Sequence, residues 1–174
     1  MHDTQRKAEE ADFAAFCVLQ HPRLVGALTL YCRNPELAQD LAQEALARIW
    51  RDWRRLQNVT SLEAYTFRAA FNLANSHFRK RAVRRRHQRR IESEHEAIHH
   101  DPDTAANVEL RHELAELAPN KRLALVLRYY ADLSVASTAE VMKLPQNTVK
   151  TLTRRALADL RHVLGDVEEE HDVH

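Results

Sequence analysis

The sequence predicts an all-α protein made of two small helical domains joined by a flexible linker. Only 2 of its 174 residues are glycine and 5 are proline, while alanine, leucine, arginine and glutamate, which favour helices, dominate the chain. Apolar residues recur at helical spacing, and the alternation typical of strands is hard to find. This periodicity is lost after about residue 90 and resumes near residue 108. We therefore expect domains at 8–90 and 108–165, a linker at 91–107 and an acidic tail at 166–174.

The first domain begins with a dense apolar segment, followed by a well-marked helix start. Pro22 is expected to divide the apolar segment or to begin a second helix. The run Asn34-Pro35-Glu36 predicts a helix start, because asparagine caps, proline fits the first turn and glutamate favours the positive end of the dipole. The buried face of this helix would carry Leu37, Leu41, Ala45, Ile49 and Trp53.

The segment from Ser61 to Arg90 combines a packed helix with a strongly cationic one. Thr60 and Glu63 form a capping box at its start. One apolar face follows, with Leu62, Tyr65, Ala69 and Leu73. Eight cations come next with no acidic residue among them: Arg79, Lys80, Arg81, Arg84, Arg85, Arg86, Arg89 and Arg90. A polyanion along this helix would offset the mutual repulsion by releasing counterions, which predicts a nucleic-acid surface. The alternatives are a solvated basic face or a targeting run.

Charge is unevenly distributed, although the net charge is only +1. The segment 48–90 is basic, whereas 91–116 carries acidic residues with a single arginine, Arg111. Such asymmetry suits a polyanion-binding surface beside an acidic spacer. Several histidines and carboxylates lie in the linker and tail: His95, His99, His100, Asp101, Asp103, His171 and His174. They lack the fixed scaffold that a structural zinc site needs, so no metal site is expected.

The two cysteines, Cys17 and Cys32, are isolated within apolar surroundings. Two cysteines do not make a disulfide framework, and reduced core cysteines are expected. The sequence shows neither a signal peptide nor an apolar run long enough to span a bilayer. A cytoplasmic protein is therefore expected.

The second domain has the pattern of a helix-turn-helix. Leu110, Leu114 and Leu117 lead to a break at Ala118-Pro119, and a further helix ends near Asp132. Ser134 is placed to cap a short helix, Lys143-Leu144 makes a tight turn, and 145–163 forms the last helix. Polar and basic residues at the start of such a helix can contact base edges and phosphates in the major groove. The alternative is an ordinary helical hairpin with a solvated face.

Short motifs in both domains then point to a family. The first domain holds Asp40-Leu41-Ala42-Gln43-Glu44, Arg48-Ile49-Trp50-Arg51, and Tyr65-Thr66-Phe67-Arg68-Ala69-Ala70-Phe71-Asn72 before Arg79-Lys80-Arg81. The second holds Leu117-Ala118-Pro119 with Arg122, Leu133-Ser134-Val135-Ala136, Ala139-Glu140-Val141, Thr148-Val149-Lys150 with Arg154-Arg155-Ala156, and Leu160-Arg161. From about Phe13 to Leu164 the chain resembles the extracytoplasmic-function sigma factors of bacterial RNA polymerase. Tyr65 replaces the family's usual tryptophan, and Lys143 stands at the turn where glycine is usual and the backbone is left-handed.

The resemblance implies a sigma region 2 in the first domain and a sigma region 4 in the second. Region 2 would bind core polymerase and melt the −10 element, while region 4 would bind the −35 element. The expected core-polymerase contacts are Asp40, Gln43, Glu44 and Arg48. The expected −10 contacts are Asn58, Thr60, Tyr65, Arg68, Asn72, Asn75, Arg79, Lys80, Arg81, Arg84 and Arg85. The expected −35 contacts are Gln146, Asn147, Thr148, Lys150, Thr151, Arg154 and Arg155.

The family also implies the partners of the chain. These are core RNA polymerase, through its β′ clamp helices and β flap, promoter DNA, and an anti-sigma factor that is often membrane-bound. The acidic linker resembles one that lies in the polymerase channels. The resemblance implies no cofactor, no small-molecule substrate and no catalysis by this chain.

Some of these assignments have alternatives. Tyr65 and Phe71 have the apolar spacing of core residues, and Glu44 can pair with Arg48 within its own helix. A sigma-mimicking signalling protein would lack the basic run, and a helix-turn-helix repressor would bind a palindrome as a dimer. An enzyme is disfavoured because the sequence has no glycine-rich phosphate loop, nucleophile elbow or spaced metal box.

Overall fold

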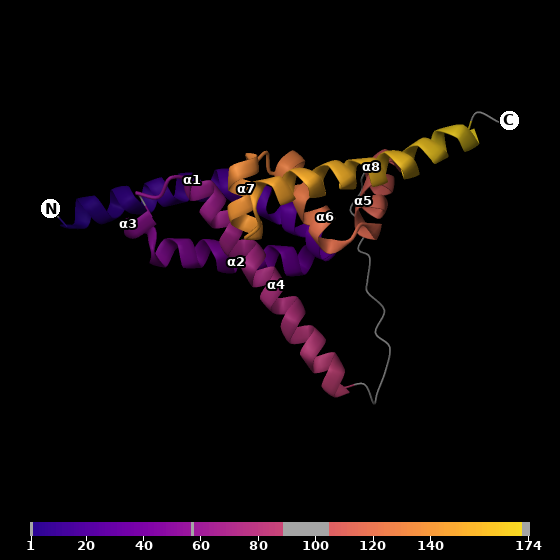
Figure 1. Cartoon of the computed structure of the whole chain (residues 1–174). Helices are drawn as coiled ribbons and strands as arrows, with labels where there is room; N and C mark the ends of the chain where they lie inside the picture. Colours follow the sequence, from indigo (N-terminus) through magenta and orange to yellow (C-terminus); the bar gives the residue numbers. More distant parts are fainter. Residues whose placement is uncertain (1, 57, 89–104, 172–174) are drawn as a thin grey trace. The chain divides into compact units, whose positions relative to one another are not determined.

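The computed structural model describes residues 2–56, 58–88 and 105–171, with side chains described for 4–84 and 110–161 apart from residue 57. Within these ranges the chain is helical and has no strand (Figure 1), which confirms the predicted fold class. It divides into two compact units, Met1–Ile98 and His99–His174. Most of the predicted linker lies outside the described residues, as do Arg89, Arg90 and the linker histidines.

Unit 1 contains four helices in its described part: α1 (His2–Cys32), α2 (Pro35–Arg51), α3 (Trp53–Leu56) and α4 (Leu62–Gln88). Helix α1 packs along α2, and α4 contacts both. Leu24, Leu28, Ile49, Phe67 and Phe71 are almost fully buried between them. Burying one such side chain is worth about 1.5–3 kcal/mol, so this three-helix core fixes the direction in which α2 and α4 present their outer faces.

Pro22 does not break α1, so the prediction of two helices there was wrong. The helix runs without interruption from His2 to Cys32 with Pro22 inside it. Pro22 lies on the exposed side, where water can satisfy the carbonyl that loses its amide partner. Buried residues follow at Leu24, Ala27 and Leu28, and their packing offsets the loss of one helical hydrogen bond.

Helix α1 also departs from the expectation that no segment is apolar enough to cross a bilayer. The stretch Thr4–Cys32 is long and apolar enough by length and composition alone. The core helix of a soluble protein or a signal sequence meets the same criterion. In this structure the second half of α1 supplies Leu24, Ala27, Leu28 and Tyr31 to the core of unit 1.

Local side-chain bonds set where the other helices of unit 1 begin. Asn34 caps α2 as predicted, since its Oδ1 accepts from the Leu37 amide at 2.9 Å. Helix α2 ends at Arg51, and Trp53 belongs to the separate turn α3. Ser61, not Thr60, caps α4, because Ser61 Oγ accepts from the Ala64 amide at 3.1 Å. The predicted capping box of Thr60 and Glu63 was therefore wrong, and a single cap at Ser61 takes its place.

Unit 2 contains α5 (Ala105–Glu116), α6 (Pro119–Leu125), the π-helical turn η1 (Val126–Tyr130), α7 (Val135–Met142) and α8 (Gln146–His171). Helix α8 packs on α6 and α7, and α5 contacts α8. Leu127, Val149 and Ala156 are fully buried in this second core. The breaks at Pro119 and near Asp132 were predicted, and the π-helical turn was not.

The π-helical turn widens the end of α6 by one residue. The Ala131 amide donates to the Val126 carbonyl at 2.9 Å, five residues back. The Arg128 guanidinium donates to the Leu133 carbonyl and ties the following loop to the turn. Tyr129 and Tyr130, at the end of the π-helical turn, are both exposed.

Candidate nucleic-acid interface and protein-binding face

Three cations in the second half of α4 are exposed among the residues whose side chains are described. In Figure 1 this part of α4 extends beyond α1 and α2, the helices that cover its first half. Arg79, Lys80 and Arg84 are exposed, and Arg81 is half-buried. An open hollow on this helix is lined by Ser76, Arg79, Lys80, Val83 and Arg84. The Arg85 side chain lies outside the described residues. Exposed cations along one helix are the arrangement that binds a phosphate backbone.

A row of polar residues runs along α4 toward these cations. Arg68, Asn72, Asn75 and Arg79 follow at spacings of four, three and four, which places them on one side of the helix. Asn72 and Arg79 are exposed. Tyr31 Oη donates to Asn75 Oδ1 at 2.8 Å, and this bond holds the Asn75 amide in one orientation. The row therefore joins amide groups to cations on one accessible surface.

The loop before α4 supplies two exposed polar side chains, Asn58 and Thr60. Tyr65, on the first turns of α4, is half-buried and packs against the core cluster of Ile49, Trp53 and Leu56. The Arg68 guanidinium carbon lies 5.2 Å from the centre of the Tyr65 ring, a cation–π distance. Tyr65 is thus partly accessible as a residue, and Arg68 covers one face of its ring.

Phe71 resolves one of the alternatives left open by the sequence. Only 1% of its surface is exposed, and its ring packs against those of Tyr31 and Phe67 at centroid distances of 5.2 and 6.4 Å. It is therefore a core residue and has no surface on which an unpaired base can stack.

The outer face of α2 carries the four predicted protein contacts. Asp40, Gln43, Glu44 and Arg48 are all exposed. Arg48 Nη2 lies 2.5 Å from Glu44 Oε1, so the intrahelical pair expected as an alternative does form. Both side chains are about half exposed, where such a pair is worth only about 0.3–0.5 kcal/mol and can be exchanged for an intermolecular one.

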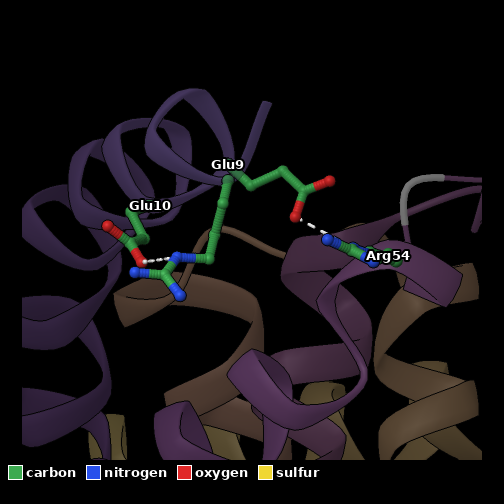
Figure 2. A network of polar contacts seen from close by, with 4 residues as sticks. Glu9, Glu10 and Arg54 are labelled. Atoms are coloured by element: carbon green, nitrogen blue, oxygen red, sulfur yellow. Dashed lines mark hydrogen bonds and ion pairs between the residues drawn. The ribbon is translucent and has the colours of Figure 1, made fainter. Parts of the chain in front are cut away.

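Aromatic and ionic contacts hold the start of α1 beside α2 and α3. Phe13 packs against both Trp50 and Trp53, with ring centroids 4.9 and 5.0 Å apart. Figure 2 shows Glu9 of α1 reaching Arg54 of α3, with Glu9 Oε2 and Arg54 Nε 2.9 Å apart. Trp50 is 39% exposed, and sequence reasoning did not select it as a surface residue. Its spacing of seven from Gln43 was the available signal.

In unit 2, α7, a tight turn and α8 form a helix-turn-helix. Ser134 Oγ accepts from the Ser137 amide at 3.0 Å and caps α7. Lys143 ends α7 in the left-handed conformation, with φ 56° and ψ 43°. The Leu144 amide donates to the Ala139 carbonyl at 3.0 Å and closes the turn. Fully buried Val149 anchors the first turns of α8 against this frame.

The predicted upstream contacts occupy the outer side of α8. Exposed side chains are those of Gln146, Asn147, Thr148, Lys150, Arg154 and Arg155. Thr151 is half-buried, and its hydroxyl donates to the Asn147 carbonyl at 2.9 Å, so it is less accessible than the others. Five of the six exposed residues carry donors long enough to reach base edges or phosphates.

Polar contacts link α8 to α6, and α6 to the end of α5. Lys121 Nζ of α6 lies 2.5 Å from Asp159 Oδ2 of α8. Arg122 donates to the Ala115 and Leu117 carbonyls at 2.6 and 3.1 Å and so caps the end of α5. These contacts hold α5, α6 and α8 together.

Among the described residues no three His, Cys, Asp or Glu side chains gather as a metal site would require. Cys17 and Cys32 are free thiols, and both are half-buried. Burial raises the pKa of the Cys17 thiol, which keeps it protonated at neutral pH.

Comparison with known proteins identifies the two units. The family model for sigma-70 region 2 matches residues 18–84, and the model for sigma-70 region 4 matches residues 114–162. The RNA polymerase sigma-E factor of Streptomyces antibioticus is 30% identical over 133 residues, which cover 75% of this chain and 72% of that one. The sigma-E factor of Streptomyces coelicolor is 28% identical over 158 residues, covering 90% of this chain and 88% of the relative.

A solved structure shows the same fold. The sigma factor RpoE of Bartonella quintana, crystallised with the anti-sigma factor NepR, superposes with a TM-score of 0.78 at 23% identity. The match covers 88% of this chain and 97% of that one. Sigma factors are transcription initiation factors. With a region 2 in unit 1 and a region 4 in unit 2, the chain belongs to the sigma-70 family of RNA polymerase sigma factors, in its extracytoplasmic-function group.

Proposed function

We propose that this sigma factor binds core polymerase through α2 and contacts two separated promoter elements through α4 and α8. The observation that carries the proposal is the coexistence of two exposed cationic surfaces on separately packed units. Each surface alone offers few contacts, so free chain binds DNA weakly. Polymerase fixes the spacing of the two units and thereby raises the effective concentration for the second contact.

The outer face of α2 is the proposed polymerase surface. Asp40, Gln43, Glu44 and Arg48 offer carboxylates, an amide and a cation on a helix whose other side is buried. Such a mixed polar face suits a basic helical partner, namely the β′ clamp helices. The β flap would hold unit 2.

The −10 element would meet the loop before α4 and the polar row along it. Asn58, Thr60 and Asn72 supply polar groups for unpaired bases, and the accessible part of Tyr65 supplies a stacking surface. Phosphate contacts would come from cations on the same helix. These are Arg68, Arg79, Lys80, Arg81, Arg84 and Arg85. Asn75, whose amide is hydrogen-bonded by Tyr31, would help to orient the DNA strand that lies along α4.

The −35 element would meet the outer side of α8. Arg154, Lys150 and Gln146 are the strongest candidates for base-edge contacts, since each is exposed and carries long donors. Asn147, Thr148, Thr151 and Arg155 complete the proposed set. The chain itself performs no catalysis in this scheme, because the polymerase supplies the chemistry.

An anti-sigma factor is the proposed regulator, with the protein acting in the cytoplasm. The support is the solved RpoE relative, whose partner is an anti-sigma factor. A membrane-bound anti-sigma factor would couple an external signal to release of the chain.

The test is transcription from a randomised promoter library by sigma-free core polymerase, with and without the purified chain. We expect transcripts that begin downstream of a bipartite motif and depend on the chain. A chain that binds a palindrome as a dimer and starts no transcript would be a helix-turn-helix repressor. A chain that binds polymerase or anti-sigma factor without binding promoter DNA would be a sigma mimic.

A further inference from the structure

Trp50 is an unusual residue on the surface of unit 1. It lies one residue before the end of α2, and 39% of its surface is exposed, whereas Trp53 three residues later is 6% exposed. It lies seven residues after Gln43, and so the two side chains leave α2 on nearly the same side. Trp50 therefore forms the edge of the outer face that carries Asp40 and Glu44.

The exposed indole is held by an aromatic cluster. The Phe13 ring lies against Trp50 at 4.9 Å, with an angle of 39° between the ring planes. Phe13 in turn meets Trp53 edge-on at 5.0 Å, and Phe16 packs on Trp53 at 5.4 Å. A side chain that rests on a packed ring loses little conformational entropy when a partner covers its other side.

The first turns of α1 keep this cluster in place. Phe13 and Phe16 come from α1, while Trp50 and Trp53 come from α2 and α3. The Glu9–Arg54 ion pair joins α1 to α3 (Figure 2), and Arg6 pairs with Glu10 at 3.3 Å within α1. The position of Trp50 thus depends on a segment remote in sequence.

We propose that Trp50 is an apolar anchor of the polymerase-binding surface and that Phe13 is its positioning residue. The inference rests on the proposed function of the α2 face. Binding energy in protein interfaces concentrates in a few large side chains, tryptophan foremost, that are surrounded by polar contacts. Here the polar contacts are already present at Asp40, Gln43 and Glu44, and Trp50 adds the large apolar group that those residues lack.

The test measures the affinity of the full chain for sigma-free core polymerase. Trp50→Ala weakens binding by about ten- to thirty-fold, and Trp50→Phe restores most of it. The matched control is Leu19→Ala on α1, which removes a residue that is 66% exposed and changes affinity less than two-fold. Circular dichroism of each variant checks that the helices persist.

A double-mutant cycle tests the positioning role of Phe13. Phe13→Ala weakens binding in the chain that has Trp50 and adds little in the Trp50→Ala background, because it acts through the indole. Phe13→Tyr retains the ring and restores affinity. Equal effects of Phe13→Ala in both backgrounds would overturn the positioning role.

A photo-crosslink gives evidence that is independent of folding losses. Benzoylphenylalanine in place of Trp50 crosslinks to core polymerase, and the same group in place of Leu19 does not. If Glu44→Ala weakens binding while Trp50→Ala does not and no crosslink forms, the anchor role is rejected and the α2 face stands. If the unaltered chain does not bind polymerase at all, the proposed function itself fails.

Discussion

The two units present cations to DNA in different ways. In unit 1, Arg79, Lys80 and Arg84 lie on the part of α4 beyond its packed half, where even the apolar Val83 is 52% exposed. In unit 2, the cations of α8 lie on a helix whose opposite side is buried at Val149 and Ala156. Unit 1 therefore offers charge along a helix, while unit 2 offers donors fixed in a rigid frame. The first arrangement favours phosphate binding, and the second can distinguish bases.

The two units have separate hydrophobic cores, and a substitution in one core should therefore leave the other unit unaffected. The Phe67 side chain is fully buried, with 0% of its surface exposed to solvent. Phe67→Ala therefore leaves a large cavity in the core of unit 1. We expect the free energy of unfolding of unit 1 to fall by about 3–5 kcal/mol. Hydrogen exchange should show lost protection in α1, α2 and α4, with α6 to α8 unchanged. Val83→Ala on the same helix is the control, and equal loss of protection in both units would show that they share one core.

Removing the α4 cations tests whether unit 1 binds mainly phosphates. For polymerase-bound promoter DNA, log affinity falls as log salt rises, and the triple variant Arg79→Ala, Lys80→Ala, Arg84→Ala should make this negative slope shallower by about 2–3, since each lost phosphate contact removes about 0.7–0.9 from its magnitude. The loss should be similar for every promoter sequence. A loss confined to one −10 sequence would instead mark these residues as base contacts.

Arg154→Ala should show the opposite behaviour in unit 2. If Arg154 contacts a base edge, the variant loses about 1–3 kcal/mol of discrimination at one upstream position and little affinity elsewhere. Competition binding with single-base variants of the upstream element measures this. Arg161→Ala, also an exposed arginine of α8, is the control. A uniform loss on all sequences would reassign Arg154 to a phosphate.

A substitution in the turn of the helix-turn-helix should give the smallest change, a small change in the free energy of unfolding of unit 2. Lys143 has a positive φ of 56°, which a β-carbon disfavours. Lys143→Gly should therefore raise the free energy of unfolding of unit 2 by up to about 1 kcal/mol, after the greater freedom of glycine in the unfolded chain is subtracted. Lys150→Gly, inside α8, should lower it by about 1 kcal/mol. Two changes of the same sign in thermal melts would contradict this account of the turn.

Most local features of the fold were predictable from the sequence, with the cap of α4 as the exception, and features set by packing were not. The caps at Asn34 and Ser134 and the turn at Lys143 depend on neighbouring residues, and all three are present. The continuity of α1 through Pro22 depends on the core around Leu24, which no local pattern reveals. The π-helical turn similarly follows from how α6 meets the next loop.

The candidate sites show the same limit. The family resemblance implied contact residues such as Asp40 and Lys150, and the structure shows that both are exposed. Spacing alone did not separate Phe71, which is buried, from Tyr65, which keeps an accessible part. The spacing of seven from Gln43 was a signal for an exposed Trp50, but the packing of Phe13 against its ring depends on α1, which local spacing does not reveal. The DNA and polymerase contacts themselves stay predictions.

The spacing between the two promoter elements tests the central claim most directly. On a promoter found with this chain, the −35 element is moved by 5 base pairs relative to the −10 element, about half a turn of DNA. If polymerase aligns the DNA-binding surfaces of the two units, transcription should fall sharply when the spacing changes by 5 base pairs. The binding of an isolated −35 element should stay unchanged. Undiminished transcription at both spacings would contradict the claim that both units hold one promoter at once.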